Sequence, residues 1–207
     1  QWAYAVSRIW ARGVLFFSGV SVEARLDPAL DPAGRYVFLA NHQSLFDIPA
    51  LLASAPGSVR LVAKKTLFHI PVFGWAMHAA GYIPVDRDDR SQAFGTFRAA
   101  AEKLRAGTSI LLFPEGTRSR TGELSPFQRG GFLLAMKSGL PIVPVGIRGT
   151  FAVQPRNRFS IRPGKVIVSY GAPIDIREFG LKRKRDLMGG VREKVAELAG
   201  LDPQVAS

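Results

Sequence analysis

The sequence contains no cysteine and few histidines. The absence of cysteine excludes disulfides, thiolate metal sites and a cysteine nucleophile. The histidines are His42, His69 and His78, and they are not spaced as zinc ligands usually are, for example in the pattern H-E-x-x-H. We therefore expect neither a metal nor another cofactor.

Long apolar runs are also absent, so no stretch is long enough to cross a bilayer as a hydrophobic helix. The segment from Trp2 to Val22 is nonetheless aromatic and aliphatic, interrupted by Arg8 and Arg12. Tryptophan, tyrosine and arginine favour the headgroup level of a membrane, which predicts an interfacial helix; packing of the same helix on the core explains the pattern equally well. Because the sequence begins with Gln1 and not Met, it leaves room for a membrane anchor upstream.

Acidic residues are scarce relative to basic ones. There are 16 Asp and Glu against 28 Lys and Arg, which gives a formal net charge of +12. This excess favours an anionic partner, which could be nucleic acid, an anionic membrane surface or a phosphorylated substrate. With 207 residues, 47% of them hydrophobic, the chain can bury one substantial core. We expect one domain over residues 23–207, preceded by the apolar segment 1–22.

Apolar runs of strand length alternate with helical patterns along most of the chain. This alternation predicts an α/β fold with a mainly parallel central sheet flanked by helices and an N-terminal interfacial helical segment. Residues 67–77 contain Pro71 and form either a kinked core helix or an apolar wall. The last strand is expected at an edge, where it can be antiparallel. The predicted strands are residues 20–26, 36–40, 59–63, 81–85, 109–113, 142–147 and 166–170, and the predicted helices are residues 45–54, 91–106, 127–138 and 182–198.

One stretch carries the clearest chemistry. The apolar run from Tyr36 to Ala40 ends at Asn41 and His42, and Asp47 follows five positions after the histidine. A histidine at the carboxyl edge of a sheet can take a proton near neutral pH, and an aspartate can hold the ring in one tautomer. The alternative is structural: Ser44 and Asp47 have the spacing of a capping box that opens a helix.

Three of the predicted strands end in polar residues that suit a phosphorylated substrate. Asn41-His42 follows the first, Lys64-Lys65 the second, and Glu115-Gly116-Thr117-Arg118 the third. Because the carboxyl ends of parallel strands share one edge, these groups are expected to converge on one pocket. Arg118 offers a fork for phosphate oxygens, and Gly116 lets the backbone approach an anion. A polar turn with an internal ion pair is the alternative for residues 115–118.

Patterns of other catalytic strategies are missing. The sequence has no G-x-S-x-G elbow, no G-x-x-x-x-G-K-[ST] phosphate loop and no G-x-G-x-x-G dinucleotide turn. The remaining chemistry is a direct transfer. His42 would remove a proton from a substrate hydroxyl, whose oxygen attacks an activated carbonyl of a second substrate, without a covalent enzyme intermediate.

Four short blocks form a more specific pattern. They are residues 41–47 (Asn-His-Gln-Ser-Leu-Phe-Asp), 81–87 (Gly-Tyr-Ile-Pro-Val-Asp-Arg), 113–119 (Phe-Pro-Glu-Gly-Thr-Arg-Ser) and 142–145 (Ile-Val-Pro-Val). In this order they resemble the motifs of the glycerolipid acyltransferases, the family of bacterial and eukaryotic 1-acylglycerol-3-phosphate acyltransferases, whose first motif is N-H-x-x-x-x-D. The second block departs from many relatives in its apolar residues. The first 35 residues and the region after Gly149 carry little of the resemblance.

The resemblance implies a role for each matching position. It implies that His42 is the general base and Asp47 its partner. The block around Pro144 would line the acyl region. The residues implied to bind the acceptor, chiefly through its phosphate, are Glu115, Gly116, Thr117, Arg118, Lys65, Lys64 and Arg87.

The implied reaction moves a fatty acyl group from acyl-CoA or acyl-carrier protein to the 2-hydroxyl of lysophosphatidate, which gives phosphatidate for phospholipid biosynthesis. The implied partners are this donor, the lysophosphatidate acceptor and an anionic membrane surface, with no nucleic acid. The implied location is the cytoplasmic face of a bacterial inner or plasma membrane. The composition agrees, because both substrates are anionic and both carry an apolar tail.

Two alternatives stay open at the level of sequence. The four blocks specify acyl transfer better than they specify the acceptor, so another lysophospholipid or an aminolipid is the first. The second is a basic module that holds nucleic acid or membrane without catalysis. A nucleic-acid binder would expose aromatic residues beside its basic face for stacking, whereas this sequence places most aromatics inside apolar runs.

Overall fold

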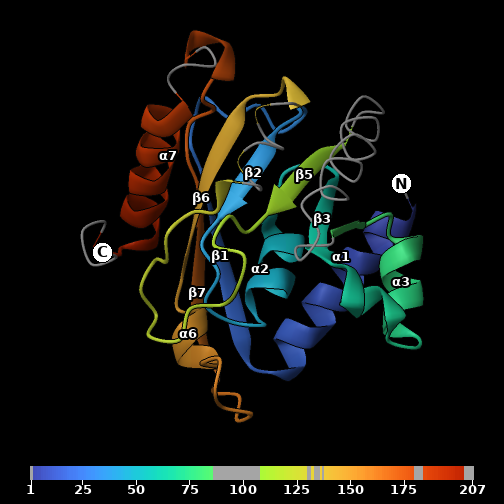
Figure 1. The fold of residues 1–207 in the computed structure, drawn as a ribbon. Helices are drawn as coiled ribbons and strands as arrows, with labels where there is room; N and C mark the ends of the chain where they lie inside the picture. Colours follow the sequence, from blue (N-terminus) through green and yellow to red (C-terminus); the bar gives the residue numbers. More distant parts are fainter. Residues whose placement is uncertain are drawn as a thin grey trace.

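The computed structural model describes residues 2–85, 108–129, 132, 136, 138–179 and 184–202. Arg87 and the predicted helix 91–106 lie outside the described residues. The ribbon in Figure 1 shows a central sheet with helices on both sides. The helices are α1 (Trp2–Phe17), α2 (Asp47–Ser54), α3 (Phe73–Ala79), α6 (Thr150–Val153) and α7 (Lys184–Ala199), with 3₁₀ turns η1 (Lys65–His69) and η2 (Ile176–Phe179). The strands are β1 (Val20–Leu26), β2 (Val37–Ala40), β3 (Val59–Lys64), β4 (Ile83–Val85), β5 (Ser109–Leu112), β6 (Ile142–Arg148) and β7 (Gly164–Tyr170).

These described strands form one seven-stranded sheet in the order β1-β7-β6-β2-β5-β3-β4. Strand β2 is parallel to both of its neighbours, β5 and β6, and β3 is parallel to β4 and β5. Strand β7 is antiparallel to β6 and parallel to β1. The predicted α/β fold with a mainly parallel sheet is confirmed. The antiparallel strand is next to the edge, and β1 forms the edge itself.

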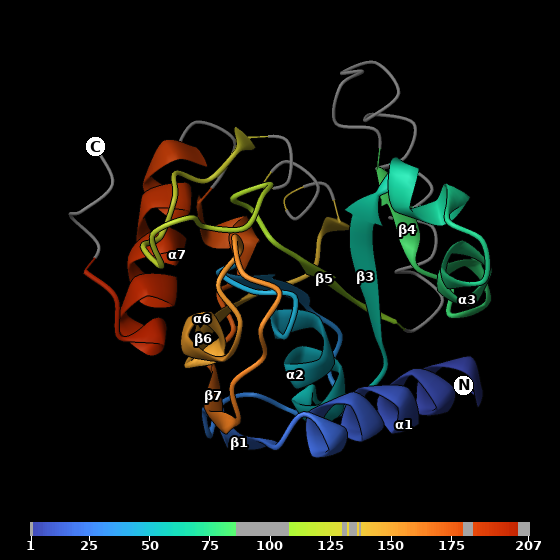
Figure 2. The same ribbon diagram turned by 90° about the horizontal axis from the view of Figure 1, so that it is seen from below.

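The sheet is covered on both faces, and β2 shows why its sequence is apolar at every position. Phe38 and Ala40 face the layer that contains α1 and α2, whereas Val37 and Leu39 face the layer that contains α7. All four residues are fully buried. A parallel strand buried on both faces is expected to read as an unbroken apolar run. Figure 2 shows α7 on one side of the sheet and α1 with α2 on the other.

Helix α1 packs on the core, which is one of the two alternatives that its sequence left open, and the interfacial role stays a prediction. Tyr4, Ala11 and Leu15 are buried, and the helix packs on α2, where a guanidinium nitrogen of Arg8 donates to the carbonyl of Ala53 at 3.2 Å. Several large apolar residues on the same helix nevertheless remain exposed, among them Phe17, which is 90% exposed. Within the described part of the chain, no helix is both long and apolar enough to span a bilayer.

The apolar segment after β3 forms two short helical elements, with Phe68 and Met77 buried in the core and other apolar residues exposed. The 3₁₀ turn η1 ends at His69, Val72 has a φ of 64°, and α3 begins at Phe73. Proline interrupts the helical hydrogen-bond pattern at Pro71, between these two elements. Val72 is 70% exposed and Trp75 is 69% exposed.

Candidate active site

Asn41 fixes the point at which β2 ends. Its side-chain amide donates to the carbonyl of Ile147 at 2.9 Å and accepts from the N–H of the same residue at 2.7 Å. The side-chain amide therefore makes the two hydrogen bonds that a further backbone pair between β2 and β6 would make. The side chain is fully buried, and His42 follows directly at the carboxyl edge of the sheet.

The His42 side chain is held from two sides. Its Nδ1 lies 2.8 Å from Oδ2 of Asp47, and its ring stacks on the ring of Phe113 with centroids 3.9 Å apart. The side chain remains 15% exposed. When Nδ1 carries the proton that bonds to the carboxylate, Nε2 has a free lone pair and is the ring atom available to a substrate hydroxyl.

Asp47 holds the turn before α2 as well as the ring of His42. Its Oδ2 accepts the backbone N–H groups of Gln43 at 2.7 Å and Ser44 at 2.8 Å. Helix α2 begins at Asp47 itself, and its N-cap residue, Phe46, makes no side-chain capping bond, so these bonds stabilise the turn and do not complete a capping box. The carboxylate is fully buried at the start of the helix. One oxygen thus organises the turn and orients the imidazole.

Glu115 is buried against main-chain donors. Its Oε1 accepts the N–H of His42 at 2.6 Å, and its Oε2 accepts the N–H of Ser125 at 2.9 Å. Burial raises the pKa of this carboxyl to about 7, with a smaller contribution from the negative charge of Asp47, although the two N–H bonds act in the opposite direction. Both oxygens of Glu115 are therefore engaged by the protein's own backbone.

The loop from Glu115 to Ser125 is joined to the histidine segment at further points. The N–H of Ser119 donates to the carbonyl of His42 at 2.7 Å, and the side-chain amide of Gln43 donates to the carbonyl of Gly122. Gly116 adopts a φ of 77°, which glycine tolerates without strain. The predicted convergence of the ends of β2 and β5 is present in the structure.

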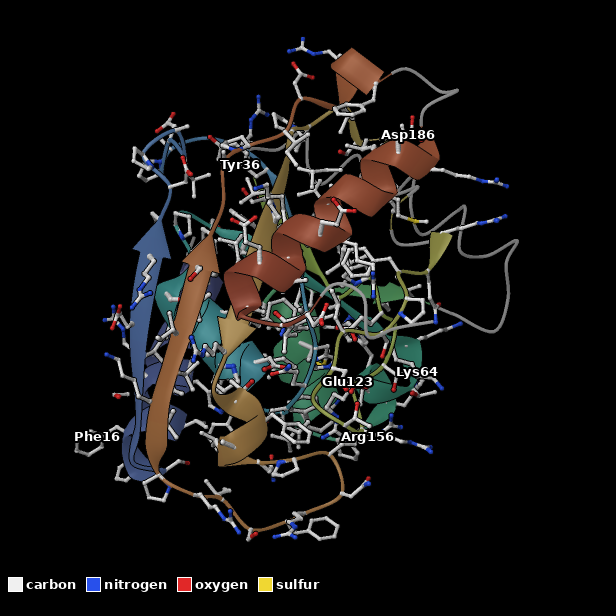
Figure 3. All side chains as sticks on the ribbon, turned by 90° about the vertical axis from the view of Figure 1, so that its left-hand side faces the viewer. Phe16, Tyr36, Lys64, Glu123, Arg156 and Asp186 are labelled. Carbon is white, nitrogen blue, oxygen red and sulfur yellow. The ribbon has the colours of Figure 1, made fainter. Side chains whose placement is uncertain are left out.

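The predicted cationic residues lie at the same edge. Arg118 is half-buried, and its carbonyl accepts a guanidinium N–H of Arg156 at 2.8 Å. Lys64 ends β3 and Lys65 begins η1; both are exposed, and β3 is the neighbour of β5. Figure 3 shows Lys64 and Arg156 at one end of the molecule, with Tyr36 at the other. The pattern of strands and motifs gave no signal for Arg156, which follows α6.

A family model described as Acyltransferase matches residues 21–148. The chain belongs to the acyltransferase family. It is 38% identical over 167 residues to the chloroplastic 1-acyl-sn-glycerol-3-phosphate acyltransferase BAT2 of Brassica napus, a match that covers 80% of this chain and 46% of the relative. It is 34% identical over 190 residues to the 1-acyl-sn-glycerol-3-phosphate acyltransferase of Escherichia coli, covering 91% of this chain and 77% of that one.

The fold of this acyltransferase also matches a solved relative. The crystal structure of the 1-acyl-sn-glycerophosphate acyltransferase PlsC from Thermotoga maritima superposes with a TM-score of 0.82 at 28% identity, covering 95% of this chain and 78% of that chain. The chain thus spans less than half of the plant relative and about three quarters of the bacterial relatives. The family resemblance drawn from the four blocks is confirmed.

The described residues of the acyltransferase enclose an apolar cavity of about 260 Å³. One of its lining residues is Ile48, the neighbour of Asp47, and the cavity lies in the layer that Phe38 and Ala40 face. Its walls come from α1, α2, β3, η1 and α3. The lining residues are Val6, Ser7, Trp10, Ile48, Leu52, Leu61, Ala63, Leu67, Phe73, Ala76, Met77, Ala79, Ala80 and Tyr82.

The Pro144 block does not line this cavity, and its place in the acyl region stays a prediction. The block is part of β6 in the middle of the sheet, and the ring of Pro144 lies beside Gly171 and Leu198. Val143 and Val145 of the block face the layer that holds the cavity, whereas Pro144 faces the other layer. Because successive residues of a strand point to opposite faces, the sequence block alone did not show which face Pro144 takes.

Proposed function

We propose that this acyltransferase moves a fatty acyl group from a thioester donor, acyl-CoA or acyl-carrier protein, to the 2-hydroxyl of 1-acylglycerol-3-phosphate, which yields phosphatidate. The observation that carries the proposal is the contact between the His42 and Asp47 pair and the Glu-Gly-Thr-Arg turn at one sheet edge. The curated names of the relatives support lysophosphatidate as acceptor.

His42 acts as the general base in this scheme. Its Nε2 takes the proton from the 2-hydroxyl as the oxygen attacks the carbonyl carbon of the thioester, and Asp47 stabilises the imidazolium that forms. The tetrahedral intermediate then collapses with cleavage of the carbon–sulfur bond. The leaving thiolate receives the proton from His42, so that the imidazole is neutral again after each turnover.

The acceptor's phosphate is bound by the cations that follow β3 and β5. Arg118 offers a planar fork for two phosphate oxygens, and Lys64 and Lys65 add two ammonium groups. Gly116 and Thr117 let the backbone of the turn approach the headgroup. Arg87, which the family resemblance implies as a further ligand, belongs to the same proposal.

Glu115 has a different role from the one its motif implies. A carboxylate that already accepts two backbone N–H groups is poorly suited to contact a phosphate, which carries the same sign of charge. We propose that Glu115 is a positioning residue, which fixes the main chain of His42 relative to the turn that carries Arg118. The acyl chain of a substrate occupies the apolar cavity that Ile48 helps to line.

Association with an anionic membrane surface completes the proposal. Residues 1–22 form an interfacial segment and residues 23–207 the acyltransferase domain, which acts at the cytoplasmic face of the membrane. The support is physical: α1 exposes Ile9, Trp10 and Phe17, while Arg12 on the same helix can reach lipid phosphates.

The decisive experiment is product analysis with purified protein. Lysophosphatidate is offered with a ladder of acyl-CoA and acyl-carrier-protein donors, and phosphatidate should form. Parallel reactions contain a lysophospholipid with a larger headgroup, an aminolipid and monoacylglycerol, which lacks the phosphate. A strong preference for an acceptor without phosphate would refute the assignment of Arg118, and salt-sensitive binding of nucleic acid without any acyl transfer would refute the function.

A further inference from the structure

Exposed apolar side chains gather at the catalytic edge of the sheet. In the described part of the chain, several belong to segments that follow β2 and β3, and others to segments that precede β1 and β7. Exposed apolar residues that adjoin one another on a basic protein indicate an interaction surface. The exposed large apolar residues of these segments are Phe16, Phe17, Leu45, Leu67, Ile70, Val72, Phe73, Trp75, Phe159 and Ile161.

The directions of the strands place the segment before β1 next to the segment before β7. Strand β6 is parallel to β2, so the chain that leaves β6 emerges at the edge where His42 lies. Because β7 is antiparallel to β6 and parallel to β1, the residues that precede β7 and β1 lie at this edge too. The N–H of Gly164 donates to the carbonyl of Gly19 at 3.2 Å, which joins the two segments directly. Figure 1 shows the end of α1 and the loop after α6 at the bottom of the molecule.

The 158–162 loop, Arg158-Phe159-Ser160-Ile161-Arg162, projects from this edge on a fixed base. The N–H of Arg162 donates to the carbonyl of Val153 at 2.9 Å, and the N–H of Arg158 donates to that of Pro155 at 3.1 Å. At the tip, Phe159 is 100% exposed, and Ile161 is 47% exposed. Nothing in the described fold buries this phenyl ring, although the loop that carries it is held at both ends.

We propose that the 158–162 loop is a membrane contact, which inserts Phe159 and Ile161 into the interface of an anionic bilayer while Arg158 and Arg162 meet lipid phosphates. The inference rests on the proposed function, because it names the surface at which the acceptor lipid is taken up. Apolar side chains flanked by arginines match the apolar and anionic levels of such an interface. The neighbouring end of α1, with Phe16 and Phe17, extends the same surface.

The loop is also coupled to the active site through its base. Gln154, before the loop, accepts the hydroxyl of Ser44 at 2.8 Å, and Arg156 donates to the carbonyl of Arg118 at 2.8 Å. Docking of the loop on the bilayer therefore sets the height of His42 and Arg118 relative to the lipid headgroups. The 2-hydroxyl of lysophosphatidate lies at that level, next to its phosphate.

Absence of native cysteine allows a direct test of insertion. Phe159→Cys in the full chain is labelled with a polarity-sensitive fluorophore and mixed with vesicles of phosphatidylcholine and phosphatidylglycerol. Leu26→Cys, at the opposite end of β1 and 40% exposed, is the matched control. We expect a blue shift and quenching by quencher-bearing lipids at position 159 and neither at position 26. A label at 159 that stays in a water-like environment while the protein is vesicle-bound would overturn the proposal.

Substitution of the loop separates this inference from the proposed function. The variant Phe159→Ser with Ile161→Ser should partition onto these vesicles at least about tenfold more weakly, since two apolar side chains no longer leave water. Its turnover of a short-chain lysophosphatidate dissolved as monomers should equal that of the wild type. If the wild type does not convert that acceptor, the proposed function fails. If it does, and the variant partitions like the wild type, the loop inference alone fails.

The basic residues of the loop allow an independent vesicle-binding experiment. Arg158→Gln with Arg162→Gln should lower partition onto vesicles with phosphatidylglycerol about tenfold and change partition onto pure phosphatidylcholine little. Arg25→Gln with Arg177→Gln is the control, because both cations lie toward the opposite edge. An equal loss in the control pair would mean that net charge alone acts. If the loop variants lose self-association and keep vesicle binding, the surface is a contact between copies of the chain. Either this result or an equal loss in the control pair overturns the proposal.

Discussion

The backbone N–H of His42 donates to Oε1 of Glu115 at 2.6 Å, and this bond joins the end of β2 to the end of β5. The other oxygen of the same carboxylate holds Ser125, ten residues further along the loop. The carboxylate thus connects the proposed base to the turn that carries Arg118. Two motifs that look independent in the sequence share one hydrogen-bond network.

Glu115→Gln should lower kcat about tenfold to a hundredfold and change the KM for lysophosphatidate little. A carboxamide has one acceptor oxygen, so its NH₂ group must face either the N–H of His42 or that of Ser125, and the imidazole shifts from its working position. Steady-state kinetics with varied acceptor check this. Glu123→Gln, an exposed glutamate of the same loop, is the control and should behave like the wild type. A large rise in KM with normal kcat would instead return Glu115 to the substrate site.

His42→Ala should abolish acyl transfer while the protein remains folded. The residue follows β2, its side chain is 15% exposed, and its removal leaves the backbone bonds to Glu115 and Ser119 in place. Phosphatidate formation and thermal unfolding are measured on the same preparation. Residual turnover within about tenfold of the wild type would exclude a general base at this position.

Asp47→Asn should reduce kcat by about a thousandfold or more, but less completely than loss of the imidazole. The carboxylate that favours the productive tautomer and stabilises the imidazolium is lost. Because Asp47 also accepts two backbone N–H groups, some loss of stability is expected as well. Ser44→Ala separates the effects: it removes the hydroxyl bonded to Phe46 and Gln154, and should cost about 1 kcal/mol of stability with kcat unchanged. A normal rate in Asp47→Asn would leave the aspartate with only its structural role in the turn before α2.

Sequence patterns were sufficient for features that depend on neighbours along the chain. The apolar run of β2 predicted a buried strand, and the strand ends predicted one polar edge. Features set by distant partners could not be read in this way. Arg156 meets Arg118 across 38 positions, and Asn41 meets Ile147 across 106, so neither bond leaves a local pattern.

The same limit applies to two positions whose contacts the motifs did not show. A glutamate followed by Gly-Thr-Arg suggests a polar turn around an anion, and nothing local shows that its carboxylate folds inward onto Ser125. Pro144 lies in an apolar block, but only the pairing of β6 with β2 decides which layer the ring faces. The candidate catalytic and binding residues could be predicted from their types and spacing. Their contacts could be known only from the pairing of the strands in the sheet.

Arg118→Ala should raise the KM for lysophosphatidate about tenfold to a hundredfold with a smaller change in kcat, because a charge-assisted contact to the phosphate is lost. Arg156→Ala should raise the same KM less, since Arg156 acts on the carbonyl of Arg118. The exposed Arg120→Ala, two positions away, is the control for net charge. Initial rates at fixed donor and varied acceptor give the comparison. If Arg120→Ala has the same effect as Arg118→Ala, the loop attracts anions only through its overall charge.

The free energy of unfolding of the protein should depend on pH because of Glu115. Its pKa is raised by burial from 4.5 to about 7, so between these values the folded state binds more protons than the unfolded state. The free energy of unfolding that this group contributes is therefore fully present below about pH 4.5 and is lost as the pH rises through about 7. The shift corresponds to roughly 3 kcal/mol.

Urea unfolding of the wild type and Glu115→Gln across this pH range isolates the effect. Titrating groups remote from Glu115 are present in both proteins and largely cancel in the difference. The wild type should lose stability relative to Glu115→Gln as the pH rises from about 4.5 to about 7, and the difference should level off above that. A difference that stays constant over the range, or that changes in favour of the wild type, would mean that the two backbone N–H bonds outweigh burial and keep Glu115 ionised throughout.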